Sequence, residues 1–216
     1  TAMILDDIVA AKRREVEAAK RRLPLEELMR RVEARQHRRG FKAALQQATK
    51  RPALIAELKR KSPSRGMLRE RFDPVSLAQQ LQDAGASALS VLTDEPFFGG
   101  HLEFLRDAHQ FTEIPSLRKD FLLEAYQVYE AVYYEADAIL LIVGILNEPQ
   151  LRELLAAARQ VNVDAIVEVH AEPELERALA AGADIIGINH RDLRTFTMQP
   201  ETTAQLVPKI PKGTLV

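Results

Sequence analysis

Along most of the chain, short apolar runs alternate with longer stretches in which apolar residues recur every three or four positions. The short runs have the length and composition of buried strands, and the longer stretches have the periodicity of amphipathic helices. The expected strands lie at residues 54–58, 88–92, 114–118, 138–143, 164–169, 184–189 and 214–216. The expected helices between them include 76–84, 101–110, 124–135, 147–160, 172–182 and 200–207. This alternation predicts βαβ units and a parallel sheet.

An internal repeat joins helix ends to strands. Ala84-Gly85-Ala86-Ser87 and Ala181-Gly182-Ala183-Asp184 each precede an apolar run, as expected for a helix that ends in a tight turn. A third copy carries Glu135 in place of the glycine, so we expect its helix to end without a left-handed residue. No Gly-x-Gly-x-x-Gly or Walker loop follows any strand, which argues against a nucleotide-binding doubly wound sheet. The repeated units favour a (βα)8 TIM barrel.

The first part of the chain, residues 1–48, has a different pattern. From residue 3 it is helical and highly charged, with narrow apolar stripes that include Ile8 and Val16, and Pro24 lies where a second helix could start. We interpret it as an N-terminal helical extension of one domain that covers residues 1–216. A complete barrel has eight strands and about 250 residues. The seventh strand is only beginning at residues 214–216, so we expect C-terminal strands 7 and 8 to be missing or truncated in this chain.

Composition narrows the classes of protein. The chain has 30 basic and 31 acidic residues, a balance that gives no indication of a nucleic-acid partner. It contains no cysteine, which excludes disulfides, thiolate catalysis and cysteine-ligated metals and favours a reducing compartment. No apolar run approaches the roughly 18–20 residues of a membrane span, and charge enters before any apolar core in residues 1–7. We therefore expect a cytoplasmic enzyme or binding protein.

The first expected strand carries two opposite charges. Because side chains alternate along a strand, Glu57 and Lys59 point to the same face, while Ala56 and Leu58 point to the other. In a sheet covered on both faces, such a pair is costly unless the charges pair or line a site. The alternative is an exposed strand edge with ordinary surface charges, and this segment alone does not decide between them.

Other polar residues follow the later strands. The active sites of (βα)8 barrels lie at the carboxyl ends of the strands, where this chain has Lys119, Glu168, Asn189 and Arg191. Lys119 has the alternative of a solvated loop lysine, and Asn189 and Arg191 have that of turn and surface residues. Glu168, flanked by valines, has few structural roles. Convergence on one rim favours a site for proton transfer on an anionic, carbonyl-bearing substrate, without metal or thiol.

Aromatic and histidine residues near these strand ends are less informative. Phe97, Phe98 and Phe121 could form a flat apolar pocket for an aromatic ring, although the first two are more often core residues. His170 and His190 belong to no metal-ligand constellation, and we treat them as structural or incidental.

Five segments, in this order, closely resemble the indole-3-glycerol phosphate synthase family. They are Ile55-Ala56-Glu57-Leu58-Lys59 with Ser62-Pro63-Ser64, Ser90-Val91-Leu92-Thr93-Asp94-Glu95 with Phe98 and Gly100, Leu117-Arg118-Lys119-Asp120-Phe121, Val167-Glu168-Val169-His170, and Gly187-Ile188-Asn189-His190-Arg191-Asp192-Leu193. The resemblance spans nearly the whole chain. It implies a (βα)8 barrel with an N-terminal helical extension and an enzyme that uses no cofactor. The implied reaction converts a small anionic phosphosugar, 1-(2-carboxyphenylamino)-1-deoxyribulose 5-phosphate, to indole-3-glycerol phosphate with loss of carbon dioxide and water.

The resemblance also implies roles for residues. Lys119 is similar to the general acid that protonates the ketose oxygen, and Glu168 to the partner that stabilises cationic intermediates and moves protons. Glu57 and Lys59 resemble a second acid–base pair, with Lys59 also near the phosphate. Asn189 resembles a residue that orients the substrate. Arg191 and Ser62 resemble contacts to the phosphate or carboxylate of the substrate. Phe98 and Phe121 resemble the walls of the pocket for the anthranilate ring.

One departure from the family concerns phosphate binding. The Ser-Glu-Ser-Gly segment after strand seven and the glycine-rich turn after strand eight are not in this sequence. If the polypeptide ends at Val216, we expect a half-built phosphate site and little activity. The alternatives are a non-catalytic phosphosugar-binding barrel and another phosphosugar barrel enzyme such as phosphoribosylanthranilate isomerase. That isomerase relies on an early cysteine, which this chain lacks.

Overall fold

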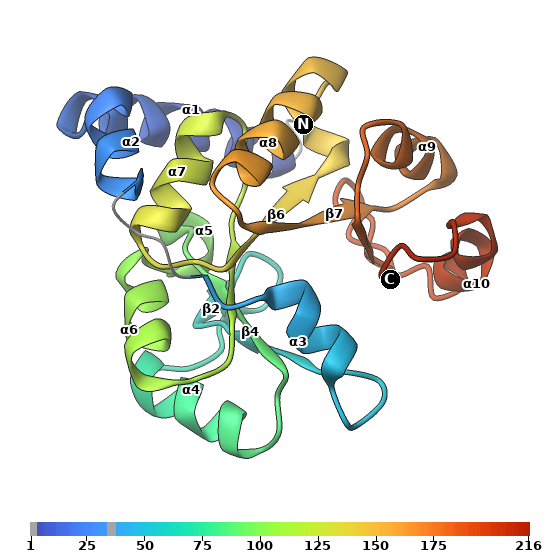
Figure 1. Cartoon of the computed structure of the whole chain (residues 1–216), viewed down its shortest axis with the longest axis horizontal. Helices are drawn as coiled ribbons and strands as arrows, with labels where there is room; N and C mark the ends of the chain where they lie inside the picture. Colours follow the sequence, from blue (N-terminus) through green and yellow to red (C-terminus); the bar gives the residue numbers. More distant parts are fainter. Residues whose placement is uncertain (1–3, 34–37) are drawn as a thin grey trace.

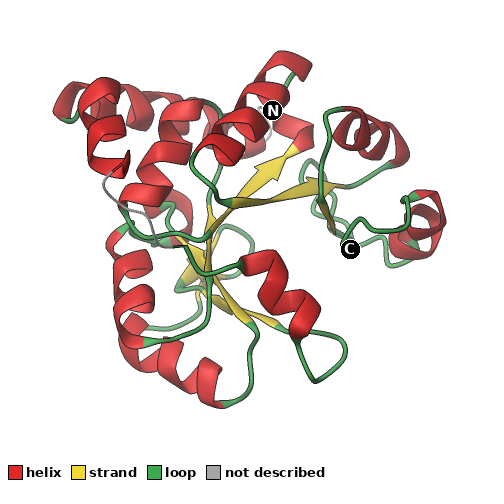
Figure 2. Cartoon of the chain, in the orientation of Figure 1, coloured by secondary structure: helices red, strands yellow, loops and turns green. Residues whose placement is uncertain are grey.

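A parallel sheet forms the centre of the computed structural model, which describes residues 4–33 and 38–216 (Figures 1 and 2). Within these residues, six strands lie side by side in the order in which they occur along the chain, and every pairing is parallel. They are β1 (Ile55–Leu58), β4 (Ala88–Leu92), β5 (Ser116–Lys119), β6 (Ala138–Ile142), β7 (Asp164–Val169) and β8 (Ile185–Ile188). The prediction of βαβ units is confirmed.

Helices cover the outside of this sheet, as Figure 2 shows. Figure 1 shows α2 beside α7 and α4 beside α6. The helices are α1 (Ile4–Arg22), α2 (Leu25–Glu33), α3 (Phe41–Gln47), α4 (Pro74–Asp83), α5 (Glu95–Phe98), α6 (Glu103–Phe111), α7 (Ala125–Tyr133), α8 (Glu148–Gln160), α9 (Glu172–Ala180) and α10 (Thr202–Leu206). Two 3-10 turns, η1 (Val143–Ile145) and η2 (Val207–Lys209), and a hairpin of β2 (Lys61–Ser62) and β3 (Gly66–Met67) complete the described elements. None of the described helices is long and apolar enough to cross a bilayer.

Local sequence explains several helix starts. Asp73 caps α4 by accepting hydrogen bonds from the backbone N–H groups of Val75 and Ser76. At α8, Asn147 and Gln150 form a reciprocal capping box. Helix α2 begins directly after Pro24, where the sequence predicted a start, whereas the expected helix start at residue 3 lies outside the described residues.

The seventh expected strand forms a single bridge. Leu215 pairs in parallel with Ile185, and its carbonyl accepts a hydrogen bond of 2.8 Å from the Ile186 N–H. The Leu215 N–H donates to the Asp184 carbonyl at 3.1 Å. This contact continues the strand order beyond β8, and the six strands themselves form an open α/β sheet whose ends, β1 and β8, are not paired with each other.

The repeated helix ends share a left-handed residue. Gly85 has a φ of 98° and Gly182 one of 84°, and Glu135 takes the same conformation with a φ of 72°. The expectation that Glu135 would not do so is wrong. Its N–H donates to the Val132 carbonyl and the next N–H returns to Ala131, so the turn itself requires the left-handed conformation. A side chain there costs about 1–2 kcal/mol.

Apolar side chains bury both faces of the strands. On the outer face, residues such as Leu89, Ile139 and Val167 pack against the surrounding helices. The inner face contributes a second cluster, which includes Leu140 and Ile166 and also contains Phe41 and Leu45 of α3 together with Leu5 and Ile8 of α1. Residues of the N-terminal helices therefore complete the inner core.

Two aspartates bind the N-terminal segment to the amino ends of the strands. Asp137 accepts hydrogen bonds from the Arg39 N–H at 2.8 Å and the Ser116 N–H at 2.9 Å. Asp164 accepts one of 2.8 Å from the Lys42 N–H. The bonds from Arg39 and Lys42 satisfy part-buried backbone groups just before and within the start of α3, and they fix that helix at the amino-terminal side of the sheet.

Candidate active site

A cavity of about 470 Å³ opens at the carboxyl ends of the strands. Its lining combines charged and apolar side chains, as small-molecule sites commonly do. Eight of the nine residues predicted from the sequence line it: Lys59, Ser62, Phe98, Lys119, Phe121, Glu168, Asn189 and Arg191. The ninth, Glu57, contacts two of these residues and lies among them.

Glu57 bridges two lysines. Its Oε2 accepts a hydrogen bond of 2.7 Å from Lys119 Nζ, and its Oε1 lies 2.9 Å from Lys59 Nζ. Burial opposes the charged carboxylate, but the two ammonium groups hold the pKa of Glu57 below its ordinary value. Although β1 lies at one end of the described sheet, the charges of Glu57 and Lys59 are paired with each other at a cavity.

Glu168 and Asn189 form the opposite side of the cavity. Asn189 Nδ2 donates to Glu168 Oε1 at 3.1 Å, while Asn189 Oδ1 accepts the Arg191 N–H at 3.0 Å. The Asn189 backbone N–H also donates to the Val169 carbonyl at 3.1 Å. With both ends of its amide engaged, Asn189 orients the Glu168 carboxylate toward the cavity.

A polar and basic group occupies the rim near the β2–β3 hairpin. Arg191 Nη1 lies 3.5 Å from Ser64 Oγ, which in turn lies 3.5 Å from Ser62 Oγ. Arg65 lines the same side of the cavity. Guanidinium and hydroxyl groups in this arrangement suit a phosphate or carboxylate.

The remaining wall is apolar. The rings of Phe98 and Phe121 lie with their centroids 6.0 Å apart and their planes tilted by 36°, within the usual range for packed aromatic pairs. Leu92, Leu140 and Ile142 extend this wall, and the two-residue spacing of the last pair along β6 is the sequence signal that could have identified them.

Phe97 does not line the cavity, so grouping it with Phe98 and Phe121 was wrong. Successive residues of a helix point about 100° apart, and of the two phenylalanines on α5 it is Phe98 that lines the cavity. Further lining residues come from the hairpin and from the loop after β8, namely Pro63, Leu68, Leu193 and Phe196. No periodic pattern marks these loop positions.

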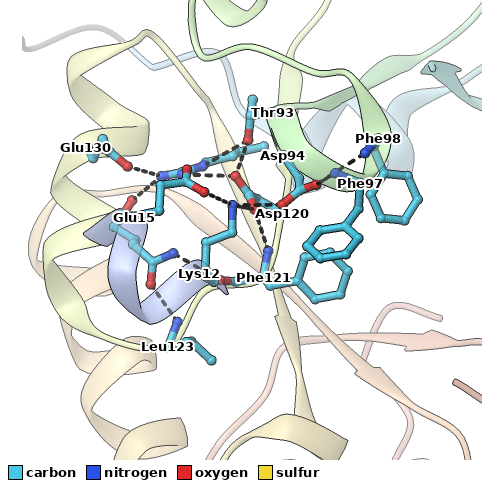
Figure 3. A network of polar contacts seen from close by, with 12 residues as sticks. Lys12, Glu15, Thr93, Asp94, Phe97, Phe98, Asp120, Phe121, Leu123 and Glu130 are labelled. Carbon is cyan, nitrogen blue, oxygen red and sulfur yellow. Dashed lines mark hydrogen bonds and ion pairs between the residues drawn. The ribbon is translucent and has the colours of Figure 1, made fainter. Parts of the chain in front are cut away.

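A buried ionic network supports the cavity from behind (Figure 3). Lys12 of α1 is 1% exposed, and its Nζ lies 2.8 Å from Asp120 Oδ1, 3.0 Å from Asp94 Oδ1 and 2.9 Å from Glu15 Oε2. Burial opposes the charge, but the carboxylates raise the pKa of Lys12. Burial likewise opposes the charge of Asp120, but Lys12 and Arg118 hold its pKa far below the usual range. Lys12 and Asp120 therefore remain ionised at neutral pH.

The same carboxylates position the aromatic wall. Asp120 Oδ1 accepts the Phe121 N–H at 2.8 Å. Asp94 Oδ2 accepts the N–H groups of Phe97 at 2.9 Å and Phe98 at 3.2 Å, which caps the short helix α5. In Figure 3 the carboxylates lie between Lys12 and the phenylalanine rings. Sequence reasoning missed Lys12, although it lies four residues from Ile8 and from Val16 in the buried stripe of α1.

Comparison with known proteins identifies the family. The family model described as indole-3-glycerol phosphate synthase matches residues 5–216. The chain belongs to the indole-3-glycerol phosphate synthase family. The resemblance inferred from five sequence motifs is thereby confirmed, and with it an enzyme of the carboxy-lyase class in tryptophan biosynthesis.

Curated indole-3-glycerol phosphate synthases match along almost all of this chain. The one from Albidiferax ferrireducens is 46% identical over 215 residues, which are 99% of this chain and 81% of the relative. The one from Burkholderia multivorans is also 46% identical, over 99% of this chain and 82% of the relative. The one from Alkaliphilus metalliredigens is 42% identical, with 99% and 82% covered. These matches favour the synthase over the isomerase considered as an alternative.

Proposed function

We propose that the cavity closes the indole ring of 1-(2-carboxyphenylamino)-1-deoxyribulose 5-phosphate to give indole-3-glycerol phosphate. We further propose that the six described strands are the first six of a (βα)8 barrel, with residues 1–48 as an extension of the same domain. The observation that carries the proposal is the position of Glu57, which holds Lys59 and Lys119 together at a cavity with one basic and one apolar side.

The two sides of the cavity support one orientation of this substrate. The carboxyphenyl ring packs against Phe98 and Phe121, where an apolar surface favours an aromatic group. The phosphate binds near Arg191 and Ser62, whose guanidinium and hydroxyl groups donate hydrogen bonds to an anion. The sugar carbons then lie between these ends, within reach of the charged residues.

Lys119 is the proposed acid of the ring closure. As the aromatic carbon attacks the ketose carbonyl, a carbon–carbon bond forms and Lys119 donates a proton to the carbonyl oxygen. The salt bridge to Glu57 orients the ammonium group for this transfer. The substrate carboxylate then leaves as carbon dioxide, and the electrons of the broken bond return to the ring system.

Glu168 is the proposed partner of the positively charged intermediates. Its carboxylate, oriented by Asn189, lies where it can stabilise a cationic ring nitrogen. In the dehydration, the hydroxyl formed in the first step takes up a proton from one of the two lysines paired with Glu57 and leaves as water, and Glu168 accepts a proton from the ring system. Lys59, held by the same carboxylate as Lys119, belongs to a second acid–base pair near the phosphate.

The proposal is tested by turnover of the carboxyphenylamino substrate. The chain has no tryptophan and four tyrosines, so fluorescence of an indole product can be followed directly. We expect Lys119→Met to lower kcat by about 100-fold or more, with KM little changed. Lys61→Met is the matched control, because Lys61 Nζ donates to the Pro96 carbonyl and does not line the cavity.

Two results would contradict the proposal. Near wild-type turnover of Lys119→Met would remove Lys119 from the acid role. Binding of the substrate without any indole product would instead favour a phosphosugar-binding protein.

A further inference from the structure

A second set of charged groups lies behind Glu168. His170 follows it by two residues at the end of β7, so both side chains project from the same face. His170 Nε2 lies 3.5 Å from Glu168 Oε1. On the other side of the ring, Glu174 Oε2 lies 3.2 Å from Nδ1 and accepts the His170 backbone N–H at 2.7 Å. The two side chains of the His170–Glu168 contact are only 15% and 13% exposed.

This geometry determines where hydrogens can lie on the imidazole. Glu174 is an acceptor, so Nδ1 carries a hydrogen. Nε2 is buried and has no hydrogen-bond partner among the described residues. If Nε2 carried no hydrogen, its lone pair would face the Glu168 carboxylate, and the two would repel each other with Nε2 buried away from solvent. A single proton carried by the pair, on Nε2 or on the carboxylate, turns this repulsion into attraction.

We propose that His170 and Glu168 hold one proton between them, with Glu174 fixing the imidazole, so that His170 is a positioning residue for Glu168. The effect of this pair on catalysis rests on the function proposed above. The presence of the proton on the pair does not.

The pair has two forms with the same number of protons. In one, an imidazolium faces a carboxylate, and Glu168 can stabilise a cation or accept a proton from the substrate. In the other, a neutral imidazole faces a carboxyl group, and Glu168 can donate a proton. A single buried partner thus lets Glu168 serve in both directions of proton transfer without another residue.

The charges around the ring favour the protonated pair. The groups that face His170 are Glu168 on β7, Glu174 on α9 and Asp192 in the loop after β8, all of them acidic. Burial opposes the charged imidazole, but the hydrogen bond to Glu174 and these charges raise the pKa of His170. Burial also opposes the charge of Glu174, but the bonds with His170, with Arg177 nearby, lower its pKa.

The first test does not depend on turnover. Nitrogen NMR of the imidazole rings follows the protonation of His170 against pH in the intact chain. We expect its pKa to lie above 6.5 and to fall by about one unit or more in Glu168→Gln. Glu174→Gln should lower it as well and should weaken the preference for hydrogen on Nδ1. An unchanged His170 titration in Glu168→Gln would overturn the shared proton.

A matched control is available at the surface. His101 Nε2 lies 3.2 Å from Glu95 Oε1, but these side chains are 49% and 61% exposed. Solvent screens such a pair, so Glu95→Gln should shift the His101 titration much less than Glu168→Gln shifts that of His170. Equal shifts would mean that burial is not responsible and would also overturn the proposal.

The second test is the pH dependence of turnover. In the wild type, kcat should fall as the pH rises through the apparent pKa at which the pair loses its proton. His170→Gln and His170→Asn should lack this basic limb, while His101→Gln should keep it. A decrease by the same factor at every pH would show that His170 acts only in packing. If the wild type forms no indole, the proposed function is wrong. The NMR titration still tests whether His170 and Glu168 hold one proton between them.

Discussion

Lys12 Nζ lies 2.8 Å from Asp120 Oδ1, so a residue of the first helix contacts the neighbour of the proposed acid Lys119. Both side chains are almost fully buried, and Asp94, the N-cap residue of α5, joins them. Burying one cation among carboxylates is unfavourable unless every charge is paired. The contact therefore couples the packing of α1 to the shape of the cavity.

Removing Lys12 should destabilise the protein strongly. Lys12→Met leaves Asp94 and Asp120 buried without this cation, and breaking a buried ion pair in this way costs about 3–5 kcal/mol. Urea unfolding at neutral pH measures the change in the free energy of unfolding.

The same helix provides a control for Lys12. Lys20 is 34% exposed and pairs with Glu17 at 3.2 Å and with Glu124. Exposed pairs contribute about 0–1 kcal/mol, so Lys20→Met should have a small effect. Equal losses of stability in the two variants would show that the buried network is not what stabilises α1.

Glu57 predicts a pH dependence of stability. Its pKa in the folded protein is lowered below the ordinary 4.5, so its ionised form stabilises the fold at pH values above 4.5. This contribution is lost as the pH falls through the folded-state pKa. Below pH 4.5 the wild type should therefore lose unfolding free energy relative to Glu57→Gln as the pH falls. Urea unfolding at several pH values measures it, and a difference that does not change with pH would contradict the lowered pKa.

Phe98 should contribute to substrate affinity more than to chemistry. Phe98→Ala removes one wall of the proposed ring pocket, and an aromatic pair is worth about 0.5–1.5 kcal/mol beyond burial. We expect KM to rise by about two- to tenfold with a smaller change in kcat. Phe111→Ala is a suitable comparison, because Phe111 is 42% exposed and does not line the cavity. A rise in KM in both variants would argue against a ring pocket at Phe98.

Glu135 should be a site of easy stabilisation. Glycine has no Cβ penalty in the left-handed conformation but loses more backbone entropy, so Glu135→Gly should gain about 0.5–1 kcal/mol. The reverse change, Gly182→Ala, should destabilise by about 1 kcal/mol. There a Cβ would also lie 3.0 Å from Arg159 Nη2. The thermal unfolding temperatures of the two variants should shift in opposite directions. A lower unfolding temperature for Glu135→Gly would mean that interactions of the Glu135 side chain offset its strain.

The sheet could be predicted from sequence because its strands are apolar on both faces. Two expected ranges, 88–92 and 164–169, coincide with β4 and β7. Helix ends were less certain, because a turn can impose a conformation that its residue does not prefer. Glu135 illustrates this, since the returning hydrogen bonds of its turn outweigh the preference of its side chain.

The polar part of the cavity could also be predicted, because charges inside apolar runs have few structural uses. Glu57 and Glu168 were found in this way. Residues that act through long-range contacts could not be found. Lys12 and Asp120 are 108 positions apart in the sequence, and no local pattern relates them. From the sequence, His170 is interpreted as structural or incidental, because it belongs to no metal-ligand constellation. Its contacts in the structure are with two carboxylates, those of Glu168 and Glu174.

The N-terminal segment is bound at both ends of the sheet, by Lys12 at the carboxyl side and by Arg39 and Lys42 at the amino side. The last of these bonds joins residues that are 122 positions apart. On the ribosome, these N-terminal helices would therefore emerge well before the strands that hold their partners. Until β7 has emerged, these helices lack their partners and must not aggregate. Their many charged residues favour solubility during that time.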